Sequence, residues 1–583
     1  MKGSKINREQ MERYRREGAW GTRTLADCWE EAVREYPDRE YVVDDRGNRY
    51  TYAGLDEKAS RVAAYLVSQG IGPGDVVSFQ IPIWSEFVIT TVAVLKVGAV
   101  VNPMGMCFEG EELKFLLNLS ESRLYLCPTW YHKTDYEADI LAVREAVPSL
   151  KDVVLLENIR PRKSGCRTFA EVLEAFSPER SGQSAKGLGQ PAKGPGQSVK
   201  GLGQPAKRRT PVTSDDVALL LCTSGTTRGT KEVMLTHNNL IFSEASFNRE
   251  LGLSKEDIMF MPAPLNHATG FNHGLIAPML MGAKVVLQER FDCPKALELM
   301  EREGCTYSMG ATPFIYDILK ELDQTRRELP SLRFYLCGGA PVPGAMVQRA
   351  WGHKILLCEV YGSTESCPHV YVHPQEALVL NGTTSGRPVA GVEVRLVDDQ
   401  GRDVPVGTPG EEISRGPNVF VGYLKDPAAT DQSLDDEGWF YSGDICVGDE
   451  KGNIRVIGRK KDMIVRGGEN LNANDINNDI EGCPGVADHT VIGMPDDRLG
   501  ERICAYLVLE PGVESVTRED VIEHFKRQKV NKRYWPERVE IIDELPRTDS
   551  GKVKKYLLVE DIKKRMQEDP AAGPGAYVDH CQG

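Results

Sequence analysis

Short runs of branched apolar residues alternate with longer amphipathic stretches along most of this chain. The run VVSFQI at 76–81 precedes WSEFVITTVAVLKVG, and the run KVVLQ at 284–288 is followed closely by CPKALELMEREG. A continuous apolar run is typical of a strand buried on both faces, as in parallel sheets that are covered by helices. The alternation therefore predicts an α/β fold in which mostly parallel sheets carry helices on both faces.

The pattern changes after about Gly452. NIRVIGRKKDMIV predicts two short strands joined by a charged turn, and strand–helix–strand patterning with its own apolar residues continues to about Met566. We therefore expect a large N-terminal domain at 1–459 and a smaller α+β domain at 460–566. The tail at 567–583 is rich in Pro and Gly, so we expect it to be disordered.

A tandem repeat of Gly, Gln, Pro, Lys and Ala occupies 182–209. Because it has almost no apolar residues to bury, we expect a disordered surface insertion within the first domain. The segment GLGQPA at 187–192 matches the dinucleotide-binding pattern G-x-G-x-x-A. No apolar strand precedes it and Pro191 stands where the helix would begin, so we assign no nucleotide loop there.

Composition restricts the kind of ligand and the compartment. The chain has 71 Lys and Arg residues against 85 Asp and Glu residues, and the resulting formal charge of −14 disfavours nucleic acid or an anionic membrane surface as a partner. Any anionic substrate must then be bound by a few local cations or a metal ion. The 14 cysteines include no C-x-x-C pair, and the N-terminus has no signal-peptide pattern. The most apolar stretch, at 87–95, is far shorter than the roughly 20 residues that cross a bilayer, so we expect a cytoplasmic protein without a membrane span.

An apolar strand runs directly into a loop of hydroxyl and glycine residues within 219–239. Hydroxyls and Gly amides donate hydrogen bonds to phosphate oxygens and a lysine adds a positive charge, so this loop suits a polyphosphate. It is not a Walker loop, because Thr230 and Glu232 flank Lys231. An ordinary polar turn is the alternative. The candidate phosphate-binding residues are Thr223, Ser224, Gly225, Thr226, Thr227 and Lys231.

A second polar cluster, EVYGSTES, occupies 359–366 at the end of a predicted strand, where ligands bind in α/β sheets. Tyr361 could stack on a base and Thr364 could donate a hydrogen bond to a phosphate. Glu365 could bind Mg²⁺, which prefers one or two carboxylates together with substrate phosphates. A solvated surface acid is the alternative interpretation of Glu365.

Together with further motifs, these two clusters resemble the superfamily of acyl-adenylate-forming enzymes, which includes acyl-CoA synthetases, adenylation domains of peptide synthetases and beetle luciferases. The matching motifs follow in order over almost the whole chain: TYAGLDEKASRVAAYLVSQGIGPGDVV, the Thr/Ser/Gly loop, MPAPLNHATGF, LCGGAPV, YGSTES, GWFYSGDICVGDEKGNIRVIGRKKDMIVRGGEN and LPRTDSGKVKK. LTHNN, ATPFIYD, SRGPNVFVGY and PDDRLGERICAYLVL are most similar to short- and medium-chain acyl-CoA synthetases of bacteria. For the fold, the resemblance implies a distorted β-barrel subdomain in the large domain and a mobile small domain.

The resemblance implies an enzyme that joins a carboxylic acid to AMP with loss of pyrophosphate and then passes the acyl group to the CoA thiol. ATP, Mg²⁺ and CoA are thus the expected cofactor and co-substrates. Residues 223–227 and Lys231 would hold the β- and γ-phosphates, Glu365 the Mg²⁺, and Thr364 the α-phosphate. Further nucleotide contacts would come from Gly339, Ala340, Glu359, Tyr361, Gly362, Asp444 and Arg459, with Asp444 accepting hydrogen bonds from the ribose hydroxyls.

The C-terminal motifs imply a catalytic lysine and a moving domain. By the resemblance, Lys552 in TDSGKVKK bridges the attacking carboxylate and the α-phosphate, and the small domain rotates between two poses about a hinge at Lys461. In the second pose a Gly-rich turn faces the pantetheine of CoA. That turn comprises Arg466, Gly467, Gly468 and Glu469, and a simple β-hairpin turn is the alternative.

The candidate acid pocket comprises His267 and the small residues Gly310, Ala311, Gly338 and Gly339. His267 and His273 lack a third ligand at suitable spacing, so we do not expect a metal pair, and the resemblance assigns His267 to the acyl site. No Arg or Lys is evident there to pair with a second carboxylate. We therefore expect a medium-chain fatty, alicyclic or aryl acid rather than a dicarboxylate.

Some positions depart from the usual pattern of the superfamily. Arg228, Thr230 and Glu232 stand where relatives mostly have Gly, Pro and Gly, and Asp475 and Asn477 replace a common acid pair. The leading hypothesis is an AMP-forming carboxylate–CoA ligase with small-molecule partners only. The alternatives are a stand-alone adenylation enzyme that loads a separate carrier protein, and an inactive relative that binds nucleotide or acyl-AMP. A homodimer is compatible with the sequence, which does not specify the oligomeric state.

Overall fold

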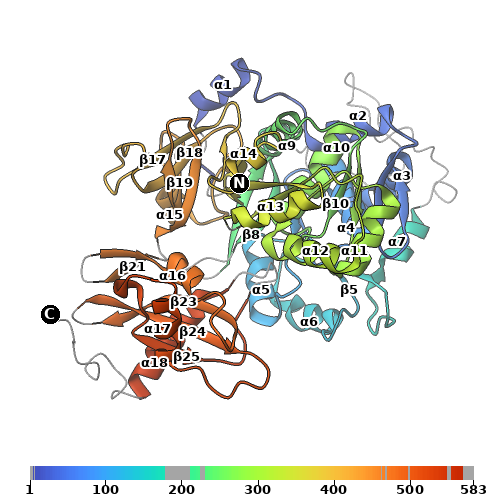
Figure 1. Cartoon of the computed structure of the whole chain (residues 1–583). Helices are drawn as coiled ribbons and strands as arrows, with labels where there is room; N and C mark the ends of the chain where they lie inside the picture. The colour runs from blue at the N-terminus through green and yellow to red at the C-terminus, as the bar shows by residue number, and fades with distance from the viewer. Residues whose placement is uncertain are drawn as a thin grey trace. The chain divides into compact units, whose positions relative to one another are not determined.

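The computed structural model of this chain describes residues 4–5, 7–176, 211–223, 230–339, 341–460, 463–466, 469–496, 499–547 and 553–568. The chain divides into two compact units (Figure 1). The first unit comprises Met1–Arg395, Ile413–Ser442 and Lys451–Ile454. The second unit comprises Leu396–Glu412, Gly443–Glu450 and Arg455–Gly583.

A nine-stranded sheet in the first unit has the order β16-β15-β14-β13-β12-β10-β11-β1-β2. Its central strands, from β14 to β1, are parallel, and an antiparallel strand or pair of strands closes each edge. The strands are β1 (Glu40–Asp44), β2 (Arg49–Thr51), β10 (Ile258–Met261), β11 (Lys284–Leu287), β12 (Tyr307–Ala311), β13 (Phe334–Gly338), β14 (Leu356–Ser363), β15 (Cys367–Tyr371) and β16 (Arg387–Pro388).

A seven-stranded sheet in the same unit has the order β7-β6-β5-β3-β4-β8-β9. All its pairs are parallel except β8 with β9, which form an antiparallel pair at one edge. The strands are β3 (Val76–Phe79), β4 (Val100–Pro103), β5 (Leu124–Pro128), β6 (Asp152–Leu156), β7 (Arg167–Thr168), β8 (Val217–Thr223) and β9 (Lys231–Thr236).

The side chains of both sheets alternate between two apolar layers, as expected for strands covered on both faces. One large cluster takes Met259 and Leu336 from the nine-stranded sheet and Val77 from the seven-stranded sheet, so the two sheets share an inner core. Phe260 and Tyr335 point instead to an outer cluster with α11 (Cys293–Glu303), α12 (Thr312–Thr325) and α13 (Gly344–Gly352). These three helices form the yellow-green group in Figure 1.

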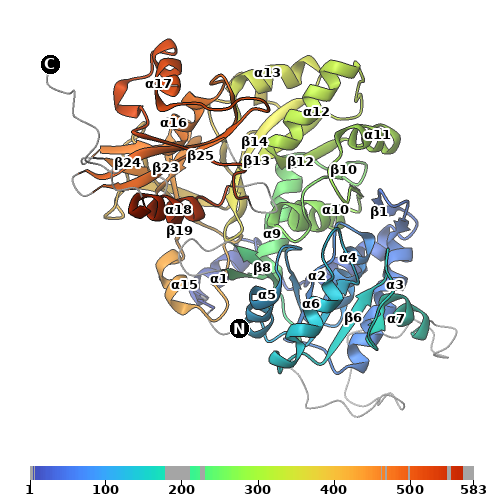
Figure 2. The ribbon, with the colours of Figure 1, turned by 90° about the horizontal axis from the view of Figure 1, so that it is seen from below.

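The outer face of the seven-stranded sheet packs against α5 (Gly110–Leu119) and α6 (Tyr136–Val143), which Figure 2 shows beside β6. The inner core contains the remaining large helices of this unit. They are α2 (Leu25–Glu35), α3 (Tyr52–Ser68), α4 (Ser85–Lys96), α9 (His237–Glu250) and the short α10 (Ala277–Met281). Further helices are α1 (Arg8–Arg16), α7 (Phe169–Ala175), α14 (Ala377–Leu380), α15 (Pro427–Ser433) and the 3₁₀ turn η1 (Arg144–Ala146). The first unit is therefore layered helix, sheet, helix, sheet, helix.

Helix α4 is the most apolar element of the chain. Apart from Glu86 and Lys96, every residue of this helix is buried. The helix contacts α3 and one strand of each sheet, β4 of the seven-stranded sheet and β1 of the nine-stranded sheet. A helix that is apolar all round must be covered on all sides, and the interior between the two sheets provides that cover. No helix among the described residues has the length and apolar character needed to span a membrane.

A four-stranded sheet of order β17-β18-β19-β20 contributes residues to both units. Its strands are β17 (Glu393–Val397), β18 (Gly410–Arg415), β19 (Phe440–Gly448) and β20 (Ile454–Arg459).

The C-terminal part of the second unit is an α+β domain. Its sheet has the order β22-β21-β24-β23, and β25 pairs with β24. Along β24, Ile503 and Ala505 face a cluster with α16 (Ala473–Ile480) and α17 (Arg518–Arg527), whereas Cys504 and Tyr506 face a cluster with α18 (Lys555–Glu568). The strands are β21 (Met463–Arg466), β22 (Glu469–Asn472), β23 (Val486–Asp496), β24 (Gly500–Leu509) and β25 (Arg538–Ile541), with a 3₁₀ turn η5 (Lys532–Tyr534).

The predicted fold class is confirmed, with a large N-terminal part of helix-covered, mostly parallel sheets and a smaller C-terminal part. The four segments that suggested the alternation form β3, α4, β11 and α11, and NIRVIGRKKDMIV contains β20 and β21. The antiparallel edges were not predicted, because continuous apolar runs do not reveal strand direction. The predicted start of the disordered tail at 567 is wrong, because Gln567 and Glu568 belong to α18. The repeat at 182–209 and residues 569–583 lie outside the described residues, so the expectation of disorder there remains a prediction.

Candidate active site

The predicted phosphate loop connects β8 to β9, the antiparallel edge pair of the seven-stranded sheet. Thr223 and Lys231 lie opposite each other in this pair, so the loop begins and ends at one point. Ser224, Gly225, Thr226 and Thr227 lie outside the described residues. The described part of the loop therefore presents one hydroxyl and one ammonium group at adjacent strand ends.

Lys231 and Glu365, far apart in the sequence, contact the ring and the hydroxyl of one tyrosine. The Lys231 ammonium lies 4.7 Å from the centre of the Tyr423 ring. The Tyr423 hydroxyl donates a hydrogen bond of 2.8 Å to Glu365 Oε1. The structure thereby brings the cation of the phosphate loop and the carboxylate of EVYGSTES into one cluster within the first unit.

The backbone around Glu365 is tied down by side chains and strand neighbours. The Phe420 amide donates to the Glu365 carbonyl oxygen at 2.7 Å. Ser363 and Ser366 exchange backbone-to-hydroxyl hydrogen bonds of 3.2 Å, which close the turn that holds Thr364. Thr364 itself is buried, with 9% of its surface exposed. The turn is therefore held in place from within and from the neighbouring segment.

Four neighbouring strands end at the same edge of the nine-stranded sheet. Gly310 and Gly338 lie at the carboxyl ends of β12 and β13, Tyr361 lies near the end of β14, and His267 follows β10. The carboxyl edge of parallel strands is where ligands bind in α/β folds. The sequence-predicted residues of the adenine and acid pockets are thus gathered at one edge, although Ala340 lies outside the described residues.

Glu359 has a supporting position in this edge. It is 4% exposed, its Oε2 accepts a hydrogen bond of 2.8 Å from the Val342 amide, and its Oε1 accepts one of 2.5 Å from Ser385 Oγ. The carboxylate, which lies on β14, therefore links this strand to the segment after β13 and to Ser385, which precedes β16. Its predicted contact with adenine remains a prediction.

Close backbone approach explains one predicted site glycine, and a left-handed conformation explains another. A Cβ atom on Gly362 would lie 2.4 Å from the carbonyl oxygen of Cys367, so the β14–β15 pair has no room for a side chain there. Gly339 has a φ of +91°, a left-handed conformation that side chains rarely adopt. Beside Gly362, Tyr361 is half-buried, with its ring centre 5.6 Å from that of His369.

The acid-pocket glycine of β12 is also sterically constrained. A Cβ atom on Gly310 would lie 2.6 Å from the Tyr335 hydroxyl and 2.8 Å from Phe314 Cδ2. Residues larger than glycine would therefore displace the aromatic side chains of Tyr335 on β13 and Phe314 on α12. This supports the predicted need for small residues at the edge.

His267 immediately precedes a π-helical segment, η3 (Thr269–Ile276). The His267 side chain is exposed, and its Nδ1 accepts a hydrogen bond of 3.3 Å from the Thr269 amide. Within η3, His273 is fully buried and lies 2.8 Å from Glu244 Oε2. Its ring also stacks on Phe247 at 4.4 Å. His273 therefore anchors the segment to α9, whereas His267 faces outward.

Glu232, a departure from the usual loop, points into the interior. Its side chain is fully buried, and its Oε1 accepts a hydrogen bond of 2.9 Å from Asn102 Nδ2. Among the described residues, Glu232 Oε2 and Asn102 Oδ1 have no hydrogen-bond partner. Burial raises the pKa of Glu232 to about 8, so the carboxyl group is protonated at neutral pH.

Asp444 and Arg459 lie in the second unit. Arg459 Nε is 2.6 Å from Asp444 Oδ1, and Asp444 is 4% exposed. The predicted placement of a positive charge beside Asp444 is therefore observed. Their contact with a ribose remains a prediction.

The proposed CoA turn joins β21 to β22. Arg466 and Glu469 are paired across these antiparallel strands, and Arg466 Nε lies 2.6 Å from Glu537 Oε1. Lys461, Gly467, Gly468 and Lys552 lie outside the described residues. Near Lys552, Arg547 and Val553 form an antiparallel bridge.

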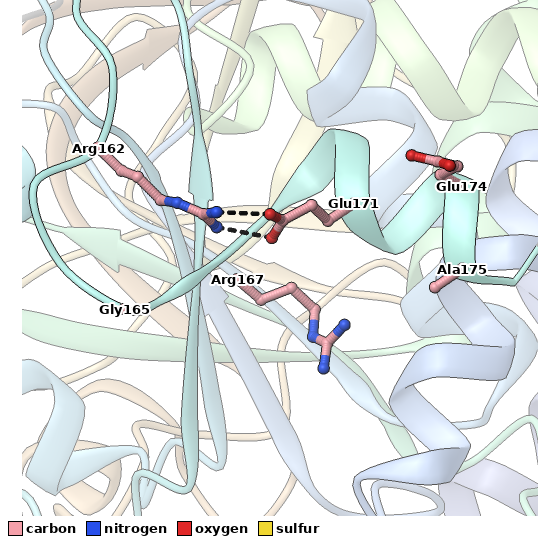
Figure 3. Close-up of a pocket in the computed structure, with 6 residues that line it drawn as sticks. All are labelled: Arg162, Gly165, Arg167, Glu171, Glu174 and Ala175. Carbon is pink, nitrogen blue, oxygen red and sulfur yellow. Dashed lines mark hydrogen bonds and ion pairs between the residues drawn. The ribbon is translucent and has the colours of Figure 1, made fainter.

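A shallow, open pocket of about 430 Å³ lies elsewhere in the first unit, between β7 and α7 (Figure 3). It is lined by Arg162, Gly165, Arg167, Glu171, Glu174 and Ala175. Arg162 forms two hydrogen bonds of 2.6 and 2.5 Å with Glu171 and lowers the pKa of that carboxyl to about 2. Because these charges satisfy each other and no sequence-predicted residue lines the pocket, we do not assign the active site there.

Sequence reasoning missed Tyr423. It lies in SRGPNVFVGY, which contributed to the resemblance, but a tyrosine in an apolar segment carries no chemical signature. The direction of the Glu232 side chain was likewise unpredictable, because strand periodicity does not distinguish a loop-facing from a core-facing residue at a strand end.

The fold and this cluster define a nucleotide-binding α/β enzyme with a separate C-terminal domain. The chain matches the AMP-binding enzyme family over residues 29–424 and the C-terminal domain of AMP-binding enzymes over residues 475–552, and it belongs to this family. It is 40% identical over 566 residues to the medium-chain fatty-acid–CoA ligase of Escherichia coli K12, covering 97% of this chain and 95% of the relative.

More distant relatives match over similar lengths. The chain is 32% identical over 515 residues to a feruloyl-CoA synthase of an Amycolatopsis species, covering 88% of this chain and 94% of the relative. Among solved structures, ATP-bound MatB from Rhodopseudomonas palustris matches with a TM-score of 0.76 at 26% identity, covering 93% of this chain and 99% of that chain.

Proposed function

We propose that this chain is an ATP-dependent carboxylate–CoA ligase that activates a medium-chain fatty, alicyclic or aryl acid to acyl-AMP and transfers the acyl group to CoA. Membership of the family and the relatives named as acyl-CoA ligases support this function. The observation that carries it is the Lys231–Tyr423–Glu365 cluster, which joins two motifs from different sheets.

The first step requires neutralised charge. A carboxylate oxygen of the acid attacks the α-phosphorus, and the bond to the β-phosphate breaks so that pyrophosphate leaves with the electron pair. Because two anions must approach each other, cations and hydrogen-bond donors have to surround the reacting phosphates. In our proposal Lys231 and Thr223 contact the β- and γ-phosphates, and Thr364 donates to the α-phosphate.

A magnesium ion fits the donor set near Glu365. Tyr423 occupies one carboxylate oxygen, Oε1, and Mg²⁺ characteristically takes one or two carboxylates while phosphates and waters complete its shell. Among the described residues no group of three His, Cys, Asp or Glu side chains gathers for a metal, which agrees with an ion bound mainly by substrate. Bound there, Mg²⁺ would neutralise charge on the phosphate oxygens.

The second step uses the C-terminal domain. The CoA thiolate attacks the acyl carbonyl carbon, and AMP leaves with the electrons of the acyl–phosphate bond. We assign the mobile domain to 460–566, the hinge to Lys461, the lysine of the first step to Lys552, and the pantetheine-facing turn to 466–469. Asp444 and Arg459 would bind the ribose, and the ion pair between the partly exposed Arg459 and the buried Asp444 supports this assignment.

The acid enters at the carboxyl edge of the nine-stranded sheet in this proposal, with His267 at the mouth and Gly310 and Gly338 along the wall. The aromatic side chain of Phe314 beside Gly310 favours an uncharged tail. We also propose a cytoplasmic location. Light scattering would measure whether the protein forms a homodimer.

The test is an acid panel measured in two assays. ATP–pyrophosphate exchange with octanoate, cyclohexanecarboxylate and ferulate reports the first half-reaction, and thioester formation with CoA reports the second. We expect exchange and thioester with at least one of these acids. Exchange without thioester would favour a carrier-loading enzyme instead, and no exchange with any acid would favour an inactive relative. The interior position of Glu232 argues against the inactive relative, because its charge is not presented to the phosphates.

A further inference from the structure

We propose that Tyr423 is a positioning residue that holds Lys231 and Glu365 apart and keeps both oriented for a metal-bound nucleotide. This inference rests on the proposed function of the site. No sequence motif identifies Tyr423 as a residue that positions Lys231 and Glu365.

The tyrosine is fixed on several sides. It is 6% exposed, its backbone amide donates to Thr430 Oγ1 at 2.9 Å, and Tyr423 forms a strand-like bridge with Val233. The ring meets Phe420 edge to face at 5.0 Å. Because Phe420 also donates to the Glu365 carbonyl oxygen, one segment holds both the phenol and the backbone of the carboxylate.

The two charged groups use different parts of the same side chain. Glu365 accepts from the hydroxyl in the ring plane, whereas the Lys231 ammonium lies over the ring as a cation–π contact. Within the described ranges, Lys231 forms no ion pair. The phenol therefore contacts both opposite charges, and each charge keeps capacity for an incoming ligand.

A smaller residue would remove this separation. Lysine is a flexible point charge, so it would then be able to pair directly with Glu365. A direct pair would neutralise the two groups that nucleotide and metal need.

Two variants separate the two contacts. Tyr423→Phe keeps the ring beside Lys231 and loses the hydroxyl, whereas Tyr423→Leu loses both. The matched control is Tyr65→Phe, which removes another buried tyrosine–carboxylate hydrogen bond, from Tyr65 to Asp152, distant in sequence from every site residue.

The measurement is equilibrium binding of α,β-methylene-ATP, which cannot form an adenylate, by calorimetry with and without Mg²⁺. Mn²⁺ binding in the presence of the analogue is followed separately by electron paramagnetic resonance. We expect Tyr423→Phe to weaken metal-dependent nucleotide binding and Mn²⁺ binding by about 10-fold or more, as for loss of a hydrogen bond to a charged group. Binding without metal should remain within about two-fold of wild type, and Tyr423→Leu should weaken that binding too.

The outcomes distinguish this inference from the proposed function. If wild type binds no adenine nucleotide, both fail. If wild type binds but Tyr423→Phe matches Tyr65→Phe in metal dependence, or loses affinity equally with and without metal, only the positioning role is overturned. Tyr423→Phe is nearly isosteric, so it decides the matter even if Tyr423→Leu fails to fold.

Discussion

Glu232 places an acid next to the phosphate-loop lysine, yet its side chain turns away from the loop. It accepts a hydrogen bond from Asn102 in the interior, and one oxygen on each of the two side chains lacks a partner. A proton on Glu232 Oε2 would supply a donor for one of these acceptors. The departure from the family pattern is therefore compatible with an intact loop, because the protonated form carries no charge.

Replacing Glu232 by glutamine should flatten the pH dependence of stability. The folded protein keeps the Glu232 proton up to about pH 8, whereas the unfolded chain loses it near 4.5. Between these values the folded state binds more protons, so the free energy of unfolding falls as pH rises, by at most about 1.4 kcal/mol per pH unit from this group. Glu232→Gln mimics the protonated acid and should gain stability over wild type above pH 7.

Urea unfolding from pH 5 to pH 9 measures this effect, with exposed Glu301→Gln as the control. An identical slope in wild type and Glu232→Gln would mean that Glu232 is already ionised in the folded protein.

At this scale the sequence predicted residue types better than their directions. Lys231, Glu365 and Thr364 were selected because phosphate and metal chemistry needs an ammonium, a carboxylate and a hydroxyl. Tyr423 was not, because its importance comes from two contacts made by segments that meet only in the folded chain. No local pattern encodes such a meeting.

The β14–β15 pair is the element on which the Lys231–Tyr423–Glu365 cluster depends. Its register shifts between Tyr361 and Gly362, directly before the turn that carries Thr364 and Glu365. This irregularity changes the direction of the following residues, as bulges beside active sites commonly do. The pair therefore determines where the carboxylate and hydroxyl point.

Adding a methyl group at Gly362 should disturb this pair. The new Cβ would lie 2.4 Å from the Cys367 carbonyl oxygen, so the strands must separate. We expect Gly362→Ala to lose about 1–3 kcal/mol of stability, the usual cost of overpacking, and to weaken nucleotide binding more than 10-fold. Chemical denaturation and calorimetry measure the two effects.

The control is Gly352→Ala at the end of α13, where nothing lies within 4 Å of the added Cβ. Equal nucleotide affinity in Gly362→Ala and Gly352→Ala would show that the turn tolerates movement of β15.

Helices and central strands were predictable because their apolar periodicity reports burial directly. The π-helical η3 was not, because its form depends on packing that the sequence does not display. A Cβ on Gly270 would lie 2.1 Å from the Pro264 carbonyl oxygen, and His273 is held by Glu244 on another helix. Both constraints come from residues outside the segment.

For the whole molecule, the two parts of the chain are proposed to serve different half-reactions, so a substitution in the C-terminal domain can impair one half-reaction and spare the other. Lys552→Ala should abolish pyrophosphate exchange and leave thioester formation from supplied acyl-AMP within a few-fold of wild type, because the lysine serves only the first step. Single-turnover assays of each half-reaction measure this. Lys554→Ala, two residues along the same segment, is the matched control, and equal loss of both half-reactions in Lys552→Ala would contradict a two-pose enzyme.

Domain organisation was predictable only in outline. The change of pattern after Gly452 predicted a second domain. Each compact unit comprises several separate segments of the chain, and the four-stranded sheet contains residues of both units, so no single boundary in the sequence divides them. Hydrophobic patterning indicates local burial, and it does not show that the chain passes more than once from one unit to the other.

The burial of α4 between two sheets also has a consequence for inactivation by heat. Because both sheets contribute to one inner core, neither can lose its packing without exposing that helix to water. The exposed segment FVITTVAVL is uncharged and rich in β-branched residues, the composition from which intermolecular β-aggregates form. Helix α4, which unites the two sheets, thus becomes a surface through which molecules associate once the fold opens. Recovery after heating then depends on the relative rates of refolding and aggregation.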